Sequence, residues 1–143
     1  MAGQKIKVDI SLGEGRSLMA KGDSNHWVPM DAPVAAGGSG AAATPMEMFL
    51  MGLAGCTSMD VVSLLRKKRV PFTDYKVETT TEREDTHPKV FKFVNIHFQI
   101  FGKGIREKDV ARSIELSSEK YCAASAMLKK ALEITTSYEI IEA

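Results

Sequence analysis

The sequence predicts an α+β fold with a largely antiparallel sheet. Residues 5–12 and 89–101 alternate polar and apolar side chains with a period of two, as strands with one buried face do. A long apolar segment after Thr44 carries the signals of a helix, and strands and helices arrive in blocks rather than in strict alternation. The 143 residues are expected to form one domain, residues 1–143.

The first part of the chain predicts a hairpin followed by a long loop. Residues 5–12 are expected to form a half-buried strand that ends at Gly13-Glu14-Gly15 and turns back along residues 17–21. Residues 22–43 lose all periodicity and contain two prolines and several glycines. We expect a long loop there rather than a linker between domains, and loops of this length are often functional.

A helix is predicted from Thr44 to about Lys68. Thr44 is a suitable N-cap, Pro45 suits the first turn, and Glu47 completes a capping box three residues after the cap. The helix should end before Pro71. Because residues 46–65 include glycines and acidic side chains, we expect this stretch to fall short of a membrane-spanning helix.

The second half of the chain predicts two strands, two helices and a closing strand. The strands cover residues 75–82 and 89–101, joined by a charged turn. A helix with an apolar stripe is expected at residues 107–120 and a shorter one at 123–132, with Cys122 between them. Residues 134–141 read as the last strand.

The charge balance argues against nucleic acid as a partner. The chain has 19 lysines and arginines against 18 aspartates and glutamates, so no large positive field is expected. The basic run at residues 66–69 falls at a helix C-terminus, where cations complement the helix dipole. No secretory signal pattern opens the chain, so we expect a cytoplasmic protein, in which a disulfide is usually transient and catalytic.

Two cysteines are therefore the first candidates for chemistry. Cys56 lies in mid-helix near Gly52 and Gly55, which cost about 1 kcal/mol each relative to alanine. The alternative is close helix packing, with Cys56 as a small buried apolar residue. Cys122 lies at or just before the start of a helix, which would stabilise its thiolate, although a structural role is the alternative there too. Two distant cysteines offer too few ligands for a structural zinc site, and we expect no metal.

Other polar and sulfur-containing side chains have plainer explanations. Glu47 can act as a general base, but its spacing from Thr44 already gives it a capping role. His26, His87 and His97 fall in a loop, a charged turn and the polar face of a strand, so we expect solvated rather than catalytic imidazoles. The methionines along the long helix are expected to fill the core, with a sulfur-rich pocket wall as the alternative.

Several motifs together resemble the OsmC/Ohr family (organic hydroperoxide resistance proteins) over essentially the whole chain. They are Thr-Pro-Met-Glu-Met at residues 44–48, Leu-Ala-Gly-Cys at 53–56 and Tyr-Cys at 121–122. Ser-Glu-Lys-Tyr-Cys at 118–122 and Ile-Thr-Thr-Ser-Tyr-Glu at 134–139 are similar to the YhfA-like branch. The resemblance implies an intertwined homodimer, with long central helices wrapped by sheets from both chains and a pocket at the subunit interface.

The resemblance also implies a thiol-dependent peroxidase that acts in oxidative or osmotic stress defence. Cys56 would attack a small or organic hydroperoxide and become a sulfenic acid, and Cys122 would resolve it as a disulfide. No bound cofactor is implied; an external dithiol, with a lipoyl group as one candidate, would restore the thiols. The family's assisting glutamate and arginine map most nearly onto Glu47 and Arg16. In the family the glutamate directly follows the proline, where this chain has Met46, and an alternative alignment places the family's arginine at Gly13 instead of Arg16.

Two other functions remain open from the sequence. One is a binding module without catalysis, which would hold an apolar or thiol-bearing ligand in the dimer-interface pocket. The other is a different thiol enzyme, such as a transferase or hydrolase, which would need a base near Cys56. Reactivity of the thiols separates the binding module from both enzymes, and turnover of a hydroperoxide separates the two enzymes from each other.

Overall fold

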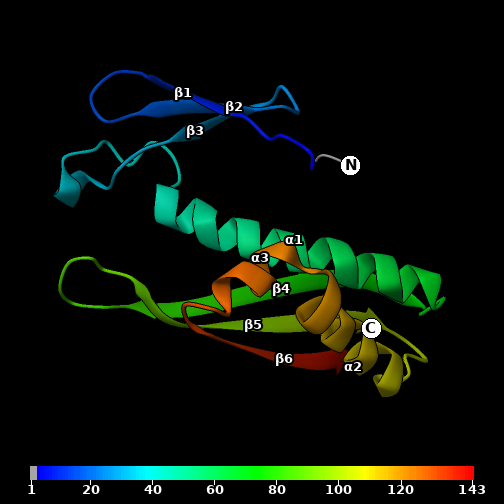
Figure 1. The fold of residues 1–143 in the computed structure, drawn as a ribbon. Helices are drawn as coiled ribbons and strands as arrows, with labels where there is room; N and C mark the ends of the chain where they lie inside the picture. The colour runs from blue at the N-terminus through cyan, green and yellow to red at the C-terminus, as the bar shows by residue number, and fades with distance from the viewer. Residues whose placement is uncertain (1–2) are drawn as a thin grey trace. The chain divides into compact units, whose positions relative to one another are not determined.

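The computed structural model describes residues 3–143, and their contacts group the chain into two compact units, Met1–Phe49 and Leu50–Ala143. Within these described residues, six strands, three α-helices and two short turns of other helix types occur in blocks (Figure 1). The α+β class is therefore confirmed. The expectation of a single domain over residues 1–143 stays a prediction.

The first unit contains a three-stranded antiparallel sheet in the order β1 (Val8–Leu12), β2 (Leu18–Gly22) and β3 (Trp27–Met30). The hairpin between β1 and β2 is confirmed, and its turn is closed by the Gly13 N–H donating to the Ser17 carbonyl at 2.8 Å. The prediction that β1 is half-buried is wrong for the chain by itself. Its apolar side chains are 56 to 74% exposed, because no layer within residues 3–49 covers them.

The long loop predicted at residues 22–43 is interrupted by regular structure. It contains β3 and a short 3₁₀-helix, η1 (Val34–Ala36). Pro29 hid β3 from the sequence pattern, yet a proline is tolerated in a strand at the edge of a sheet. Buried Asp31 then organises the rest of the loop by accepting the Ser39 hydroxyl and the N–H groups of Ala32, Ser39 and Ala41.

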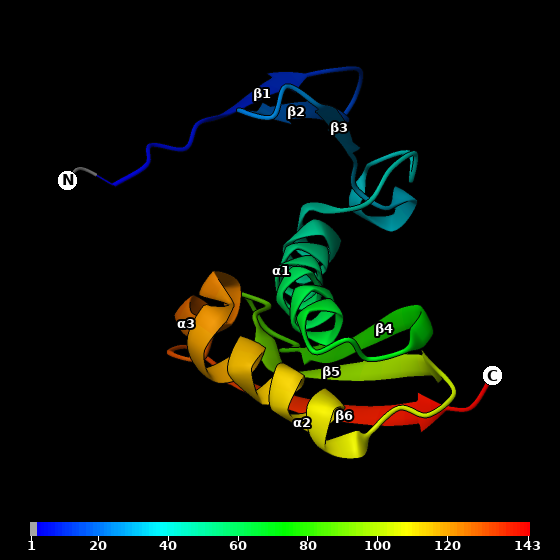
Figure 2. The same ribbon diagram turned by 90° about the vertical axis from the view of Figure 1, so that its right-hand side faces the viewer.

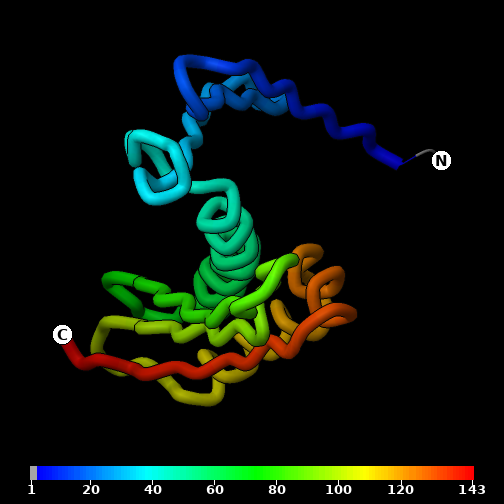
Figure 3. The backbone as a smooth tube through the Cα atoms, turned by 90° about the vertical axis from the view of Figure 1, so that its left-hand side faces the viewer, coloured from blue at the N-terminus to red at the C-terminus, as the bar shows by residue number. Residues whose placement is uncertain are grey.

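The second unit contains the other three-stranded sheet, in the order β4 (Phe72–Arg83), β5 (Phe91–Gly102) and β6 (Glu133–Ile141). β4 and β5 form the predicted antiparallel pair, whereas β6 runs parallel to β5 along its other edge (Figure 3). Since the other three strand pairings are antiparallel, the sheets are largely antiparallel, as the sequence predicts.

Helix α1 (Pro45–Lys67) begins and ends almost where the sequence predicts. The capping box is confirmed: Thr44 Oγ1 accepts the Glu47 N–H at 3.2 Å, and Glu47 Oε2 accepts the Thr44 N–H at 2.7 Å. These bonds satisfy two N–H groups that a helix start leaves without partners. At the other end the Val70 N–H closes back on the Leu65 carbonyl at 3.0 Å, just before Pro71.

The core of the second unit lies between its sheet and its helices. The inward face of β5 is fully buried, through Val94, Ile96, Phe98 and Ile100. Against it α1 buries one stripe of side chains and α2 (Glu107–Leu116) buries another, and Figures 1 and 2 show α1 running along the sheet. The buried residues of the two stripes are Leu53, Thr57, Val61 and Leu65 on α1, and Val110, Ser113 and Ile114 on α2.

The segment between α2 and the last strand differs from the prediction of two ordinary helices. α2 ends at Leu116, and the chain widens into a π-helical turn, η2 (Ser117–Tyr121), before the short helix α3 (Ala123–Leu128). The wide turn is closed by the Cys122 N–H donating to the Ser117 carbonyl at 2.9 Å. Such π-helical turns are rare and occur frequently at functional sites.

Helix α1 is also long and apolar enough to cross a membrane, with 23 residues and a mean hydropathy of 1.7 over its best window. The expectation that its polar residues bring it short of a spanning helix is therefore wrong by this measure. Core helices of soluble proteins pass the same test, and one side of α1 packs on the sheet with Leu53, Val61 and Leu65 buried.

Candidate thiol site

The two cysteines meet where α1 passes the start of α3. Cys56 is half-buried on α1, Cys122 is 2% exposed, and both are free thiols. Cys122 is the N-cap of α3, and its sulfur accepts the Ser125 N–H at 3.4 Å. The predicted position of Cys122 at the start of the third helix is thus confirmed.

Two hydroxyl side chains connect Cys122 to α1. Thr57 Oγ1 lies 3.3 Å from Cys122 Sγ, and Ser117 Oγ donates to the Thr57 carbonyl at 3.3 Å. Ser117 Oγ also lies 3.2 Å from Asp60 Oδ2. The first residue of the π-helical turn, Ser117, and the residue that follows the turn, Cys122, thus both bond to Thr57. Sequence reasoning missed Thr57 and Ser117, whose only signal was a hydroxyl residue near each cysteine.

The surroundings of Cys122 favour its thiolate. Burial by itself would raise the pKa of Cys122, but hydrogen bonds from the Ser125 and Thr57 side chains, the Ser125 N–H and the Cys56 thiol oppose burial. The net result is a pKa below the ordinary value for a cysteine. The site therefore supplies a buried sulfur that ionises readily.

The surroundings of Cys56 shift its pKa in the opposite direction, above the ordinary value. The Ala124 N–H has the largest single influence and acts to lower the pKa of Cys56, with help from the Ala123 N–H. Burial and the neighbouring Cys122, to which the Cys56 thiol donates a hydrogen bond, together raise the pKa above its ordinary value. Of the two hydrogen-bonded thiols, Cys56 thus holds its proton more tightly than an ordinary cysteine and Cys122 holds its proton less tightly.

The pair combines an accessible sulfur with a protected one. A reagent reaches the half-buried Cys56 more easily than Cys122, which is 2% exposed. The hydrogen bond between the thiols keeps the second sulfur beside the first. This arrangement suits chemistry in which Cys56 is modified and Cys122 then forms a disulfide with it.

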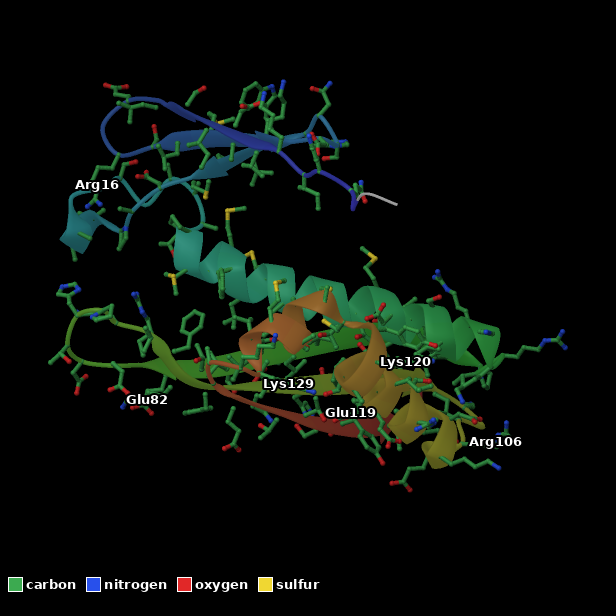
Figure 4. The ribbon with its side chains drawn as sticks, viewed as in Figure 1. Arg16, Glu82, Arg106, Glu119, Lys120 and Lys129 are labelled. Carbon is green, nitrogen blue, oxygen red and sulfur yellow. The ribbon has the colours of Figure 1, made fainter. Side chains whose placement is uncertain are left out.

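Arg16 and Glu47, the other predicted site residues, belong to the first unit. The side chain of Arg16 is labelled in Figure 4. Its guanidinium donates to the Ala36 carbonyl and borders a hollow of about 460 Å³ that is also lined by Ser17, Gly37 and Ser39. Glu47 has the capping role described above. The structure brings Cys56 and Cys122 together, while a role for Arg16 or Glu47 beside them stays a prediction.

The imidazole of His97 is partly exposed and is also held by partners on the neighbouring strand. On the outer face of the sheet its Nδ1 lies 2.8 Å from Ser137 Oγ, and its Nε2 lies 3.5 Å from Glu139 Oε1. The Gln99 amide and His97 lower the pKa of the Glu139 carboxyl. Since β5 and β6 align these residues side by side, the contacts help to fix the register of the parallel pair.

The methionines of α1 do not all fill the core, contrary to expectation. Met51 and Met59 are 57% and 78% exposed, on the side of the helix away from the sheet. Met59 also borders a hollow of about 420 Å³ with Val62, Arg66 and Tyr75. Among residues 3–143, no cluster of three His, Cys, Asp or Glu side chains is placed to hold a metal ion.

Comparisons with known proteins agree on one family. The family model of OsmC-like proteins matches residues 37–137. Protein YhfA of Escherichia coli K12 is 42% identical over 131 residues, covering 91% of this chain and 94% of YhfA. A hypothetical protein from Aquifex aeolicus VF5 has a similar solved structure, with a TM-score of 0.86, 26% identity and 99% of both chains covered.

A solved structure with lower sequence identity belongs to a protein named for its function. It is the organic hydroperoxide resistance protein OsmC from Legionella pneumophila, with a TM-score of 0.72 and 18% identity, covering 97% of this chain and 99% of that one. At this identity the likeness concerns the fold alone. The family model and the similarity to YhfA confirm what the motifs at residues 44–48, 53–56 and 118–122 indicate. This chain belongs to the OsmC-like family.

Proposed function

We propose that this protein is a thiol-dependent peroxidase that reduces organic or small hydroperoxides in oxidative or osmotic stress defence. The contact between an accessible Cys56 and a buried Cys122 is the observation that supports it most. The family is linked to hydroperoxide resistance through members such as the Legionella pneumophila protein.

In the proposed cycle Cys56 reacts first. In the reacting state the proton of Cys56 has moved along the hydrogen bond between the two thiols to Cys122. The Cys56 thiolate then forms an S–O bond to the terminal oxygen of the hydroperoxide while the O–O bond breaks, which leaves a sulfenic acid on Cys56 and an alkoxide that takes the proton from Cys122. The Cys122 thiolate then attacks the Cys56 sulfur, the S–O bond breaks, and the departing hydroxide takes a proton to become water. An external dithiol reduces the disulfide and is itself oxidised, with a lipoyl-type group as a candidate.

We propose that Arg16 and Glu47 assist the reaction of Cys56. A cation near Cys56 would favour the thiolate, and a carboxylate would orient that cation. The proposal places the protein in the cytoplasm, where the reducing environment supplies dithiols and keeps resting cysteines reduced.

The proposed assembly is a homodimer. Three features of α1 support it: Gly52 and Gly55 are exposed with open space above them, and Met59 is 78% exposed on the same side. Apolar side chains of β1 are exposed as well, including Val8 and Leu12. A second copy of the chain would cover such apolar surface, which monomers rarely leave open.

Consumption of cumene hydroperoxide in the presence of a dithiol tests the peroxidase. We expect wild type to turn over, Cys56→Ser to fall to the uncatalysed rate, and Cys122→Ser to react once and stop at a sulfenic acid. Thiols counted after one equivalent of peroxide should drop from two to none in wild type. Ser63→Ala, which removes an exposed hydroxyl on the same helix, is the matched control.

The same titration separates the alternatives. Two unreacted thiols after excess peroxide would sink the peroxidase and favour the binding module. Thiols that react while peroxide consumption stays at the uncatalysed rate would instead favour another thiol enzyme based on Cys56.

A further inference from the structure

The least expected feature of the site is the hydroxyl of Thr57. Thr57 is 1% exposed, and its Oγ1 lies 3.3 Å from the sulfur of Cys122, which is itself 2% exposed. The backbone of Thr57 is held separately, because its carbonyl accepts a bond from Ser117 Oγ. The Thr57 side chain is therefore held beside Cys122, because α1 is itself bonded to Ser117 in the turn that precedes Cys122.

The nature of the contact depends on the charge of Cys122. When Cys122 is a thiol, either group can donate the hydrogen bond, whereas a thiolate has no proton and must accept it from Thr57. Hydrogen bonds to an ionised partner are roughly twice as strong as those between neutral groups. The contact is thus stronger in the state in which Cys122 is nucleophilic.

We propose that Thr57 is a positioning residue that holds the sulfur of Cys122 as a thiolate, ready to attack Cys56. The inference deepens the proposed function, because it concerns the step that closes the disulfide. The hydroxyl and N–H of Ser125 act on the same sulfur, so the thiolate is held by donors from both α1 and α3. Burial alone would suppress a thiolate at this depth.

The ionisable neighbours of Cys122 do not replace the hydroxyl. On α1 they are Cys56 and, beyond Ser117, Asp60, whose negative charge would oppose a thiolate. Just after α3, Lys129 donates to Ser118 and lies 3.7 Å from Glu119, while Lys120 on η2 lies over the ring of Tyr121 (Figure 4). Both lysines are thus engaged with groups other than Cys122.

A disulfide exchange reaction tests the inference without any peroxide. Excess 4,4′-dithiodipyridine converts Cys56 into a mixed disulfide and releases one pyridinethione. Attack by Cys122 on the Cys56 sulfur then releases a second pyridinethione and forms the protein disulfide. Cys122→Ser should show the first release alone, which assigns the second phase to Cys122, and mass spectrometry identifies the adduct on Cys56.

Thr57→Val keeps the shape of the side chain and removes the hydroxyl, while Thr57→Ser restores a hydroxyl. We expect Thr57→Val to slow the second phase about 10- to 100-fold at neutral pH and to raise the pH midpoint of that phase by about one to two pH units. Thr57→Ser should return both values close to those of wild type. Ser113→Ala removes a buried hydroxyl bonded within α2 and is the matched control.

Two outcomes would overturn the inference. One is a second phase that slows equally at every pH in Thr57→Val with an unchanged midpoint, which is the result of a packing defect. The other is a second phase with the wild-type rate and midpoint. Because the assay contains no hydroperoxide, a failure of the proposed peroxidase and a failure of the Thr57 inference are read separately.

Discussion

Tyr75 shows how one side chain couples α1 to the sheet. Its phenol hydroxyl donates to Ser58 Oγ at 3.0 Å, and its ring lies 6.3 Å from that of Phe98. Burial raises the pKa of Tyr75 to about 12, although the bond to Ser58 opposes this shift. The phenol therefore stays protonated far above neutral pH.

The first residue-scale prediction concerns Tyr75→Phe. Loss of the hydroxyl bond should lower the free energy of unfolding by about 1 kcal/mol, measured by urea denaturation. The exposed Tyr121 provides the control, since Tyr121→Phe should change stability by less than about 0.5 kcal/mol. Equal losses in both variants would show that the bond to Ser58 contributes nothing of its own.

The raised pKa of Tyr75 predicts that the protein loses stability in alkaline solution. Its folded pKa of about 12 lies above the unfolded value of about 10, so the folded state holds its proton more tightly. The stability it contributes is complete below about pH 10 and is lost as the pH rises toward 12. Absorbance titration of tyrosinate should show a transition near pH 12 that disappears in Tyr75→Phe; its absence in wild type would contradict the prediction.

At the scale of residues, the sequence predicts the cysteines better than their surroundings. Cys122 lies at a helix start because its neighbours favour one, which the local pattern already shows. The approach of Thr57 and Ser117 depends on contacts between residues about sixty positions apart, which no local pattern contains. Glu47 was predictable as a cap for the opposite reason, since its partner Thr44 is three residues away.

Among the elements, α1 determines most of the second unit. Leu65→Ala should lower the free energy of unfolding by about 2 to 5 kcal/mol, because Leu65 is fully buried and its loss leaves a cavity. Leu64→Ala, at the half-buried neighbouring position, should cost clearly less in the same urea titration. Similar losses at both positions would mean that the buried stripe of α1 does not control stability.

Elements with strong end signals or strict alternation were predictable, and those shaped by long-range pairing were not. The capping box fixed the start of α1, and the alternation of β5 revealed its buried face. β3 escaped notice because Pro29 breaks its pattern, and only the edge of a sheet accommodates it. The parallel direction of β6 was also hidden, since it depends on the path taken by α2 and α3.

At the scale of the whole molecule, the proposed homodimer predicts an unusual effect of Gly55→Leu. In a single chain the new side chain meets open space, and replacing a glycine in mid-helix should stabilise α1 by up to about 1 kcal/mol. If a second copy packs there, the larger side chain should weaken association about 5- to 150-fold. Sedimentation equilibrium over a range of concentrations measures this constant.

Lys67→Leu is the matched control for Gly55→Leu. It adds the same side chain to an exposed position about 120° around the helix and should leave the association constant nearly unchanged. A wild-type chain that sediments as a monomer at every concentration would refute the homodimer.

The fold class was predictable at this scale, whereas the grouping of contacts into Met1–Phe49 and Leu50–Ala143 left no signal in the sequence.

The π-helical turn Ser117–Tyr121 carries one more residue than an α-helical turn closing at the same place would need. Shortening it by one residue would rotate Cys122 by about 100° relative to α2, enough to turn its sulfur away from Cys56. The turn bears none of the buried apolar side chains of the core, so such a chain would keep its core residues. A single insertion or deletion in this segment therefore offers this architecture a route to gain or lose thiol chemistry while it remains folded.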